Sequence, residues 1–192
     1  MTHPDPRSPF VLDTKLVGRR PGTMYELERE VGAPSELGTD VIRVEEGAPL
    51  HLTVRMESVV EGVLVTGSVR GTATGACVRC LDPLTDEVDG TFQELFVHAD
   101  RHVHHQEVGD ADADEEYRIE DGLIDLEPVL RDTVVPALPF QPVCRPDCPG
   151  LCSVCGMPLA EDPEHRHDEI DPRWAALSAL AEDPPSPTEK RT

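Results

Sequence analysis

The sequence predicts an α+β protein: an antiparallel β-meander bent by glycines, one packed helix, a Cys-rich segment that binds zinc, and a short C-terminal helix. Apolar and polar residues alternate from Leu50 to Glu57, which is the period of a half-buried strand. Two more extended runs follow after short turns, at 63–75 and 84–97, and their glycines permit bends or bulges. Apolar residues then recur at helical spacing between Leu126 and Val134. Because short turns join antiparallel strands, the three runs predict a meander.

Length and composition favour one acidic domain with appendages. The chain has 192 residues, of which 38 are acidic and 17 are Lys or Arg, and its net charge is −21. This charge argues against a protein that coats nucleic acid, because that function needs a basic face. No apolar run reaches the roughly 18 residues of a membrane span, and the N-terminus does not resemble a signal peptide. We therefore expect a cytoplasmic protein whose thiols stay reduced.

Changes of composition divide the chain into four segments. Residues 1–40 are expected to form a Pro/Gly-rich arm, with a short strand near its start and a helical turn at 25–31. Residues 41–143 form the β-rich core, which includes an acidic, His-rich loop at 98–118. Residues 144–181 hold the Cys-rich segment and the terminal helix, and residues 182–192 form a disordered tail.

Both predicted helices have recognisable ends. Asp125 can cap the first helix, whose apolar face is expected to pack on the sheet. Pro136 and Pro139 are expected to stop this helix. The second, at 171–180, begins with an aspartate at the N-cap and a proline at the first helical position.

The six cysteines are the most specific feature of the sequence. Two residues between cysteines let both sulfurs face one ion from a tight turn, and tetrahedral zinc needs four such ligands. Together with two nearby histidines, the candidate ligands are Cys77, Cys80, Cys144, Cys148, Cys152, Cys155, His165 and His167. Their spacing predicts one or two structural zinc sites.

Two groupings of these ligands are open. In the first, the Cys77 pair joins Cys144 and Cys148, and the other four ligands form a local site. In the second, the Cys77 pair joins the Cys152 pair as in a zinc ribbon, and Cys144 and Cys148 stay spare. A thiol redox pair is a further alternative, but such pairs usually open a helix after a strand, whereas Cys77 lies among strands.

Acidic residues concentrate between residues 85 and 130, a stretch that contains fifteen acidic and two basic residues. Such a block is either a solvated surface or a docking face for a basic partner, such as a ribosomal protein. The candidate partner-binding residues are Asp110, Asp112, Asp114, Glu115 and Glu116.

No catalytic motif is present in the sequence. It has no P-loop, no G-x-G-x-x-G and no G-x-S-x-G. A catalytic zinc keeps an open position, whereas a closed set of cysteines is typical of a structural site. The sequence therefore predicts a protein that is not an enzyme and takes no small-molecule substrate. The alternative is a metal- or thiol-dependent enzyme acting on RNA or protein.

A zinc-ribbon transcription module is disfavoured by the acidic residues that follow Cys155.

Four stretches, in order, resemble motifs of the bacterial YceD family. They are C-V-R-C-L at 77–81; G-L-I-D-L at 122–126 with V-P-A-L-P at 135–139; the Cys-rich segment at 144–156; and D-P-R-W-A-A-L at 171–177. The resemblance covers roughly residues 10–181. It implies a role in accumulation of 23S ribosomal RNA and in large-subunit assembly, with no known catalytic activity. The stretch 98–116 departs from the family pattern and resembles an embellishment.

The implied role and the charge together favour an acidic adaptor stabilised by zinc. Its expected partner is a basic large-subunit ribosomal protein or an assembly intermediate. Contact with ribosomal RNA is expected to be indirect, although arginines of the N-terminal half leave a local basic patch as an alternative.

Overall fold

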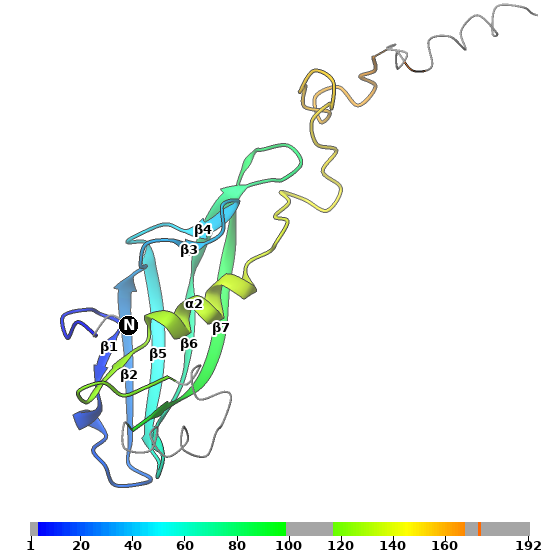
Figure 1. Cartoon of the computed structure of the whole chain (residues 1–192). Helices are drawn as coiled ribbons and strands as arrows, with labels where there is room; N and C mark the ends of the chain where they lie inside the picture. Colours follow the sequence, from blue (N-terminus) through cyan, green and yellow to red (C-terminus); the bar gives the residue numbers. More distant parts are fainter. Residues whose placement is uncertain (1–3, 99–116, 168–172, 174–192) are drawn as a thin grey trace, which may run out of the picture. The chain divides into compact units, whose positions relative to one another are not determined.

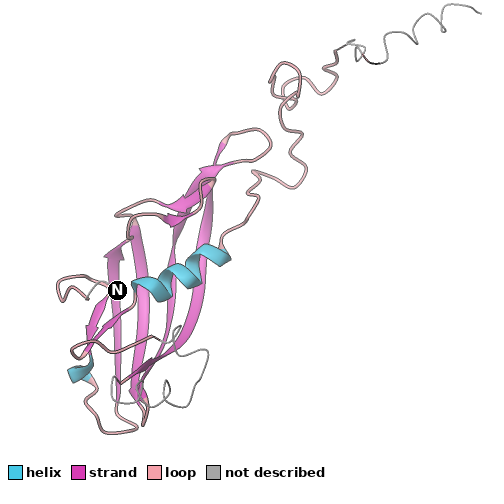
Figure 2. Ribbon diagram, in the orientation of Figure 1, coloured by secondary structure: helices cyan, strands magenta, loops and turns pink. Residues whose placement is uncertain are grey.

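The computed structural model describes residues 4–98, 117–167 and 173. The chain divides into two compact units, Met1–Cys148 and Pro149–Thr192. The first unit contains the sheets and the helix shown in Figures 1 and 2. In the described residues, no helix is both long and apolar enough to cross a membrane.

A six-stranded antiparallel sheet forms the body of the first unit (Figure 1). Its strands are β2 (Met24–Gly32), β3 (Leu37–Gly38), β4 (Ile42–Val44), β5 (Pro49–Ser58), β6 (Gly62–Ala76) and β7 (Pro83–Val97). Along one edge, β6 pairs first with β5 and then with β4; β7 pairs along its other edge. The predicted meander is confirmed, since β5, β6 and β7 follow one another through two tight connections.

The sheet has one buried face and one open face. In β5, Leu50, Leu52, Val54 and Met56 are buried, and the residues between them are exposed or half-buried. The register continues this buried face across the sheet, because Leu52 lies opposite Val69 and Val69 lies opposite Gly90, and all three residues are buried. The core is therefore mostly aliphatic and lies on one side of the sheet.

Helix α2 (Glu127–Ala137) packs against β7 and β3, and Figure 2 shows it lying across the sheet. The helix buries Val129, Leu130 and Val134. A glycine in the sheet makes this approach possible. An added Cβ at Gly90 would lie 2.6 Å from Cγ2 of Thr133 on the helix. The N-cap of α2 is Leu126, which makes no side-chain capping bond, and not Asp125 as predicted. The carboxylate of Asp125 still accepts a hydrogen bond from the backbone N–H of Glu127 at 2.9 Å, which satisfies one N–H of the first turn. The predicted packed helix is confirmed.

A second, two-stranded sheet joins the chain's beginning to the start of α2. Strands β1 (Val11–Asp13) and β8 (Leu123–Asp125) pair antiparallel, and a 3-10 turn, η1 (Thr14–Leu16), follows β1. Leu12 and Ile124, which face each other in this pair, are both buried in the main core. The N-terminal residues are therefore part of the folded body.

Two further local predictions need correction. The segment 25–31 is strand β2 and not a helical turn, because its alternate residues lie opposite the apolar side chains of β5. Residues 24–38 of the predicted arm accordingly supply strands of the sheet. Pro136 does not stop the helix but lies in its last turn, which ends with Leu138 as C-cap, directly before Pro139. The terminal helix predicted at 171–180 lies outside the described residues, except for residue 173.

Candidate metal centres

The first C-x2-C pair lies in the connection between the two longest strands. Residues 77–82 link β6 to β7, and the backbone N–H of Cys77 donates to the carbonyl of Asp82 at 2.8 Å. A second bond, from the N–H of Leu81 to the carbonyl of Cys77, tightens the turn. Leu81 has a φ of 63°, in the left-handed region that non-glycine residues rarely adopt. The hairpin thus presents Cys77 and Cys80 from one rigid tip.

The segment after α2 brings the other two cysteines to this tip. The backbone N–H of Val78 donates to the carbonyl of Pro142 at 2.9 Å, which fixes the segment beside the hairpin. The guanidinium of Arg79 donates from Nη1 to the carbonyl of Pro146 at 3.3 Å and to that of Cys148 at 3.0 Å. Arg79 therefore links the two halves of the group through the backbone that carries Cys148.

The first cysteine group consists of Cys77, Cys80, Cys144 and Cys148, whose sulfurs lie within 4.8 Å of one another. Sγ of Cys77 lies 3.8 Å from Sγ of Cys148, and Sγ of Cys80 lies 3.7 Å from Sγ of Cys144. A tetrahedral ion bonded to four sulfurs at about 2.3 Å would place those sulfurs about 3.8 Å apart. The arrangement therefore has the dimensions of a tetrathiolate site, and the group could hold a metal ion.

Hydrogen bonds favour the thiolate form of Cys77 in this group. A backbone hydrogen bond from Cys144 lowers the pKa of the Cys77 thiol to about 6, against the opposing effect of burial. Backbone bonds from Cys80 and Arg79 add to this effect. The pKa of Cys144 is raised, first by its hydrogen bond with the Cys148 thiol. Four adjacent thiolates repel one another, so a cation is needed before all four lose their protons.

The second unit contains the second cysteine group: Cys152, Cys155, His165 and His167. Here the backbone N–H of Gly156 donates to the carbonyl of Cys152, and Gly156 has a φ of 74° that suits glycine. Nε2 of His165 lies 3.2 Å from Sγ of Cys155 and 2.8 Å from Nε2 of His167. These four donor atoms lie within 4.8 Å of one another and could hold a metal ion.

Backbone groups also favour a thiolate in this second group. Hydrogen bonds from the backbone N–H groups of Cys155 and Val154 lower the pKa of the Cys152 thiol to about 6. Among residues 149–167, only Gly150 is buried, so the described part of this unit has no buried apolar side chain. Segments this small need a disulfide or a metal to hold one conformation.

The eight predicted ligands thus lie in two groups of four, as in the first of the two groupings that the spacing allows. The zinc-ribbon grouping, in which Cys77 and Cys80 join Cys152 and Cys155, is not the one found among the described residues. The predicted partner-binding residues Asp110, Asp112, Asp114, Glu115 and Glu116 lie outside the described residues. Sequence reasoning missed the role of Arg79, although its place between two cysteines is a signal that could have identified it.

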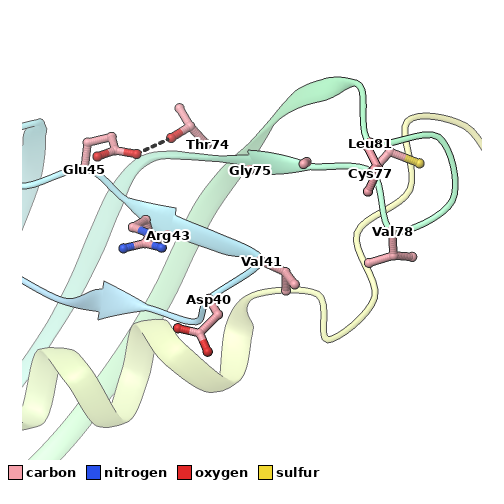
Figure 3. A pocket seen from close by; sticks show the side chains of 10 residues that line it. Asp40, Val41, Arg43, Glu45, Thr74, Gly75, Cys77, Val78 and Leu81 are labelled. Carbon is pink, nitrogen blue, oxygen red and sulfur yellow. Dashed lines mark hydrogen bonds between the residues drawn. The ribbon is translucent and has the colours of Figure 1, made fainter.

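An open hollow of about 460 Å³ lies beside the first cysteine group (Figure 3). Apolar side chains of Val41, Val78 and Leu81 line it, and each is at least two-fifths exposed. On the strand side, the hydroxyl of Thr74 donates to the carboxylate of Glu45 at 3.0 Å. The hollow is a surface recess next to the hairpin tip, and sequence reasoning did not predict it.

Comparisons with known proteins identify the family to which this chain is similar. Residues 65–181 match the model of the family described as "Large ribosomal RNA subunit accumulation protein YceD". An uncharacterized protein of Mycobacterium tuberculosis H37Rv is 48% identical over 170 residues, which cover 88% of this chain and 80% of that protein. An uncharacterized protein of Mycobacterium leprae is 41% identical over 183 residues, covering 95% of this chain and 82% of that protein. No solved structure matches the chain.

The matched region contains the longer part of β6, all of β7, helix α2 and both cysteine groups. It spans more than half of the chain, so the match does not rest on the cysteine motifs alone. The chain belongs to the YceD family.

Proposed function

We infer that this protein promotes accumulation of large-subunit ribosomal RNA as a non-enzymatic adaptor in ribosome assembly. The observation that carries the inference is the family match, because the family's description names accumulation of the large ribosomal RNA. The cysteine groups support a structural role for metal, since each offers four protein ligands and no open position for a substrate.

Zinc is the metal that the ligand sets favour. Thiolate and imidazole are the ligands that zinc prefers, and tetrahedral sets of four cysteines, or of two cysteines and two histidines, are typical of structural zinc. In the first group, zinc would join the hairpin tip to the segment after α2. In the second group, it would supply the stabilisation that a buried core supplies elsewhere in the chain.

The proposed partner is a basic component of the large ribosomal subunit, which the protein would bind in the cytoplasm. At a net charge of −21, the chain attracts cations and repels the phosphates of RNA. The acidic stretch that includes Asp110 and Glu116 follows β7 in the sequence, and β7 itself adds four carboxylates. We therefore propose capture of a ribosomal protein, with contact to RNA made indirectly through that partner.

Gradient sedimentation of a native lysate tests this function. At low salt, the untagged protein is expected to travel with large-subunit precursors and not with mature ribosomes. Moderate salt is expected to release it, because pairing between exposed charges is screened. Recovery only at the top of the gradient at both salt concentrations would contradict stable association with an assembly intermediate.

Arg79 offers a test of the first cysteine group. Lysine at this position keeps the charge but cannot direct a planar guanidinium at two carbonyls. Since partners outside the ligand shell typically change metal affinity 10- to 100-fold, Arg79→Lys is expected to weaken zinc binding at this group about tenfold. Competition with a chromophoric chelator measures this change.

Arg145→Lys is the matched control for Arg79→Lys. Arg145 lies in the same segment, but it pairs with the exposed carboxylate of Asp147 at 3.5 Å. Zinc affinity should stay within about twofold of the wild type, because exposed ion pairs contribute little. Equal zinc affinities for the Arg79 and Arg145 variants would show that the two carbonyl contacts do not position the site.

A further inference from the structure

Strand β7 has an outer edge that no strand of the described residues covers between Pro83 and Leu95. Its pairing with β6 runs through fifteen consecutive positions without a bulge, from Ala76 opposite Pro83 to Gly62 opposite Val97. Long, regular edges offer a row of backbone N–H and C=O groups to another strand. In Figure 1, β7 lies at the outer side of the sheet, opposite β2.

Hydrogen bonds at both ends of the strand show which amides point outward. The backbone N–H of Val97 donates to the carbonyl of Tyr117, and the carbonyl of Val97 accepts from Ile119, so both groups of Val97 point away from β6. The N–H of Glu87 donates to the carboxylate of its neighbour Asp86. Since amide direction alternates along a strand, every second residue from Thr85 to Leu95 points the same way.

The residues with outward amides also have accessible side chains. They are Thr85, Glu87, Asp89, Thr91, Gln93 and Leu95, of which all but the half-buried Leu95 are exposed. Their side chains project on the open face of the sheet, because α2 packs on the opposite face near Gly90. An added strand could therefore reach both the backbone of β7 and this row of side chains.

The charge of β7 selects the kind of strand that can be added. The strand contains Asp86, Glu87, Asp89 and Glu94 and no Lys or Arg. One of these carboxylates, that of Asp89, pairs with Arg70 of β6 at 3.4 Å on the exposed face. A second copy of β7 would place acids opposite acids, which destabilises a strand pair. An extended segment with Lys or Arg at alternate positions would place cations opposite Glu87 and Asp89.

We propose that a basic, extended segment of a ribosomal protein adds to the sheet as a strand along the outer edge of β7. The inference rests on the proposed function and specifies how the partner is held. Backbone hydrogen bonds align the added segment with β7, and the carboxylates of β7 favour a segment with basic side chains at alternate positions. The acidic stretch between residues 99 and 116 follows this edge directly in the sequence and adds charge of the same sign.

The experiment uses the full chain and a synthetic peptide of five Lys-Thr repeats as the probe, with affinity measured by fluorescence anisotropy. Thr91→Pro removes an outward N–H without changing charge and leaves the β6 ladder intact, since proline is tolerated where an edge N–H faces solvent. It is expected to weaken binding at least tenfold. Thr91→Ala keeps the N–H and is expected to stay within twofold of the wild type.

A second experiment varies the peptide and leaves the protein unchanged, so a folding defect of the Thr91→Pro variant cannot affect its outcome. The same peptide with alternate amides N-methylated keeps every charge but loses the donors that face β7. It is expected to bind at least tenfold more weakly, and the unmodified peptide is expected to slow hydrogen exchange of the Thr85, Asp89 and Gln93 amides. Equal binding of both peptides would overturn strand addition.

A third arm separates this inference from the proposed function. Replacing Asp110, Asp112, Asp114, Glu115 and Glu116 with their amides is expected to reduce affinity through charge alone. If only this variant loses binding and Thr91→Pro does not, the acidic stretch is the docking site and the inference fails. If strand addition is observed but the protein never travels with large-subunit precursors, the proposed function fails and the edge remains a peptide-binding surface.

Discussion

Removal of metal will abolish the fixed structure of residues 150–167 while the six-stranded sheet stays paired. The second unit has no buried apolar side chain among its described residues, so we expect its conformation to depend on metal held by the second cysteine group. Binding of structural zinc contributes about 10–16 kcal/mol in small zinc-binding peptides, which far exceeds what these turns supply alone. The sheet has its own aliphatic core and does not depend on the cysteines.

Zinc analysis and amide exchange check this result. Untagged protein should contain about two zinc ions per chain, because each group offers four ligands. After chelation, amides near Cys152 should exchange freely, while those of Leu52 and Val54 in β5 stay protected. Cys152→Ser and Cys148→Ser are matched variants, each expected to lose one zinc ion. A metal-free protein whose amides near Cys152 stay protected would contradict the structural role of zinc.

Replacing Gly67 with valine will destabilise the sheet by about 3 kcal/mol, through overpacking of its core. Gly67 of β6 lies opposite Phe92 of β7 in the register. An added Cβ at Gly67 would lie 2.5 Å from Cζ of Phe92 and 2.6 Å from the carbonyl oxygen of Thr53. The aromatic ring can move, but the carbonyl belongs to the adjacent strand β5 and cannot move without bending it.

Urea unfolding followed by circular dichroism measures this loss. Thr66→Val is the control, because Thr66 is adjacent in the same strand, is half-buried and faces the open side of the sheet. It should change the free energy of unfolding by no more than about 0.5 kcal/mol. If Gly67→Val proved as stable as Thr66→Val, the close contact between β6 and the Phe92 ring would not be a requirement of the fold.

The sequence predicts strands β5, β6 and β7 well and the opposite edge strand, β2, poorly. Strand β5 is recognisable because Leu50, Leu52, Val54 and Met56 are buried on one face and show the alternation directly. Strand β2 is not recognisable from the sequence, because Glu26, Glu28 and Glu30 are good helix formers and Val31 is the one residue of this strand that is fully buried. Its conformation is fixed by pairing with β5, which is a long-range contact that local propensity does not report.

The cysteine groups show a similar division. Spacing alone identifies each C-x2-C turn, since the geometry of such a turn is local. Spacing does not determine which turns share an ion. That depends on α2 returning the chain to the hairpin tip, where Val78 bonds to Pro142 and Arg79 to the carbonyl of Cys148.

A metal ion held by the first cysteine group would also close the chain into a ring. Cys77 and Cys148 are 71 residues apart, and Cys80 and Cys144 are 64 apart, so β7, the acidic stretch, β8 and α2 all lie within it. Doubling the length of a flexible loop costs only about 0.6 kcal/mol in closure. By the same relation, we expect a change in the number of residues between His98 and Tyr117 to alter the closure free energy of the ring only slightly. After a single cut there, the β1–β8 pair, the packing of α2 on β7 and a metal ion bound by the four cysteines would hold the two fragments together. We therefore expect that the amount of negative charge in this stretch can change while the sheets and the helix stay the same.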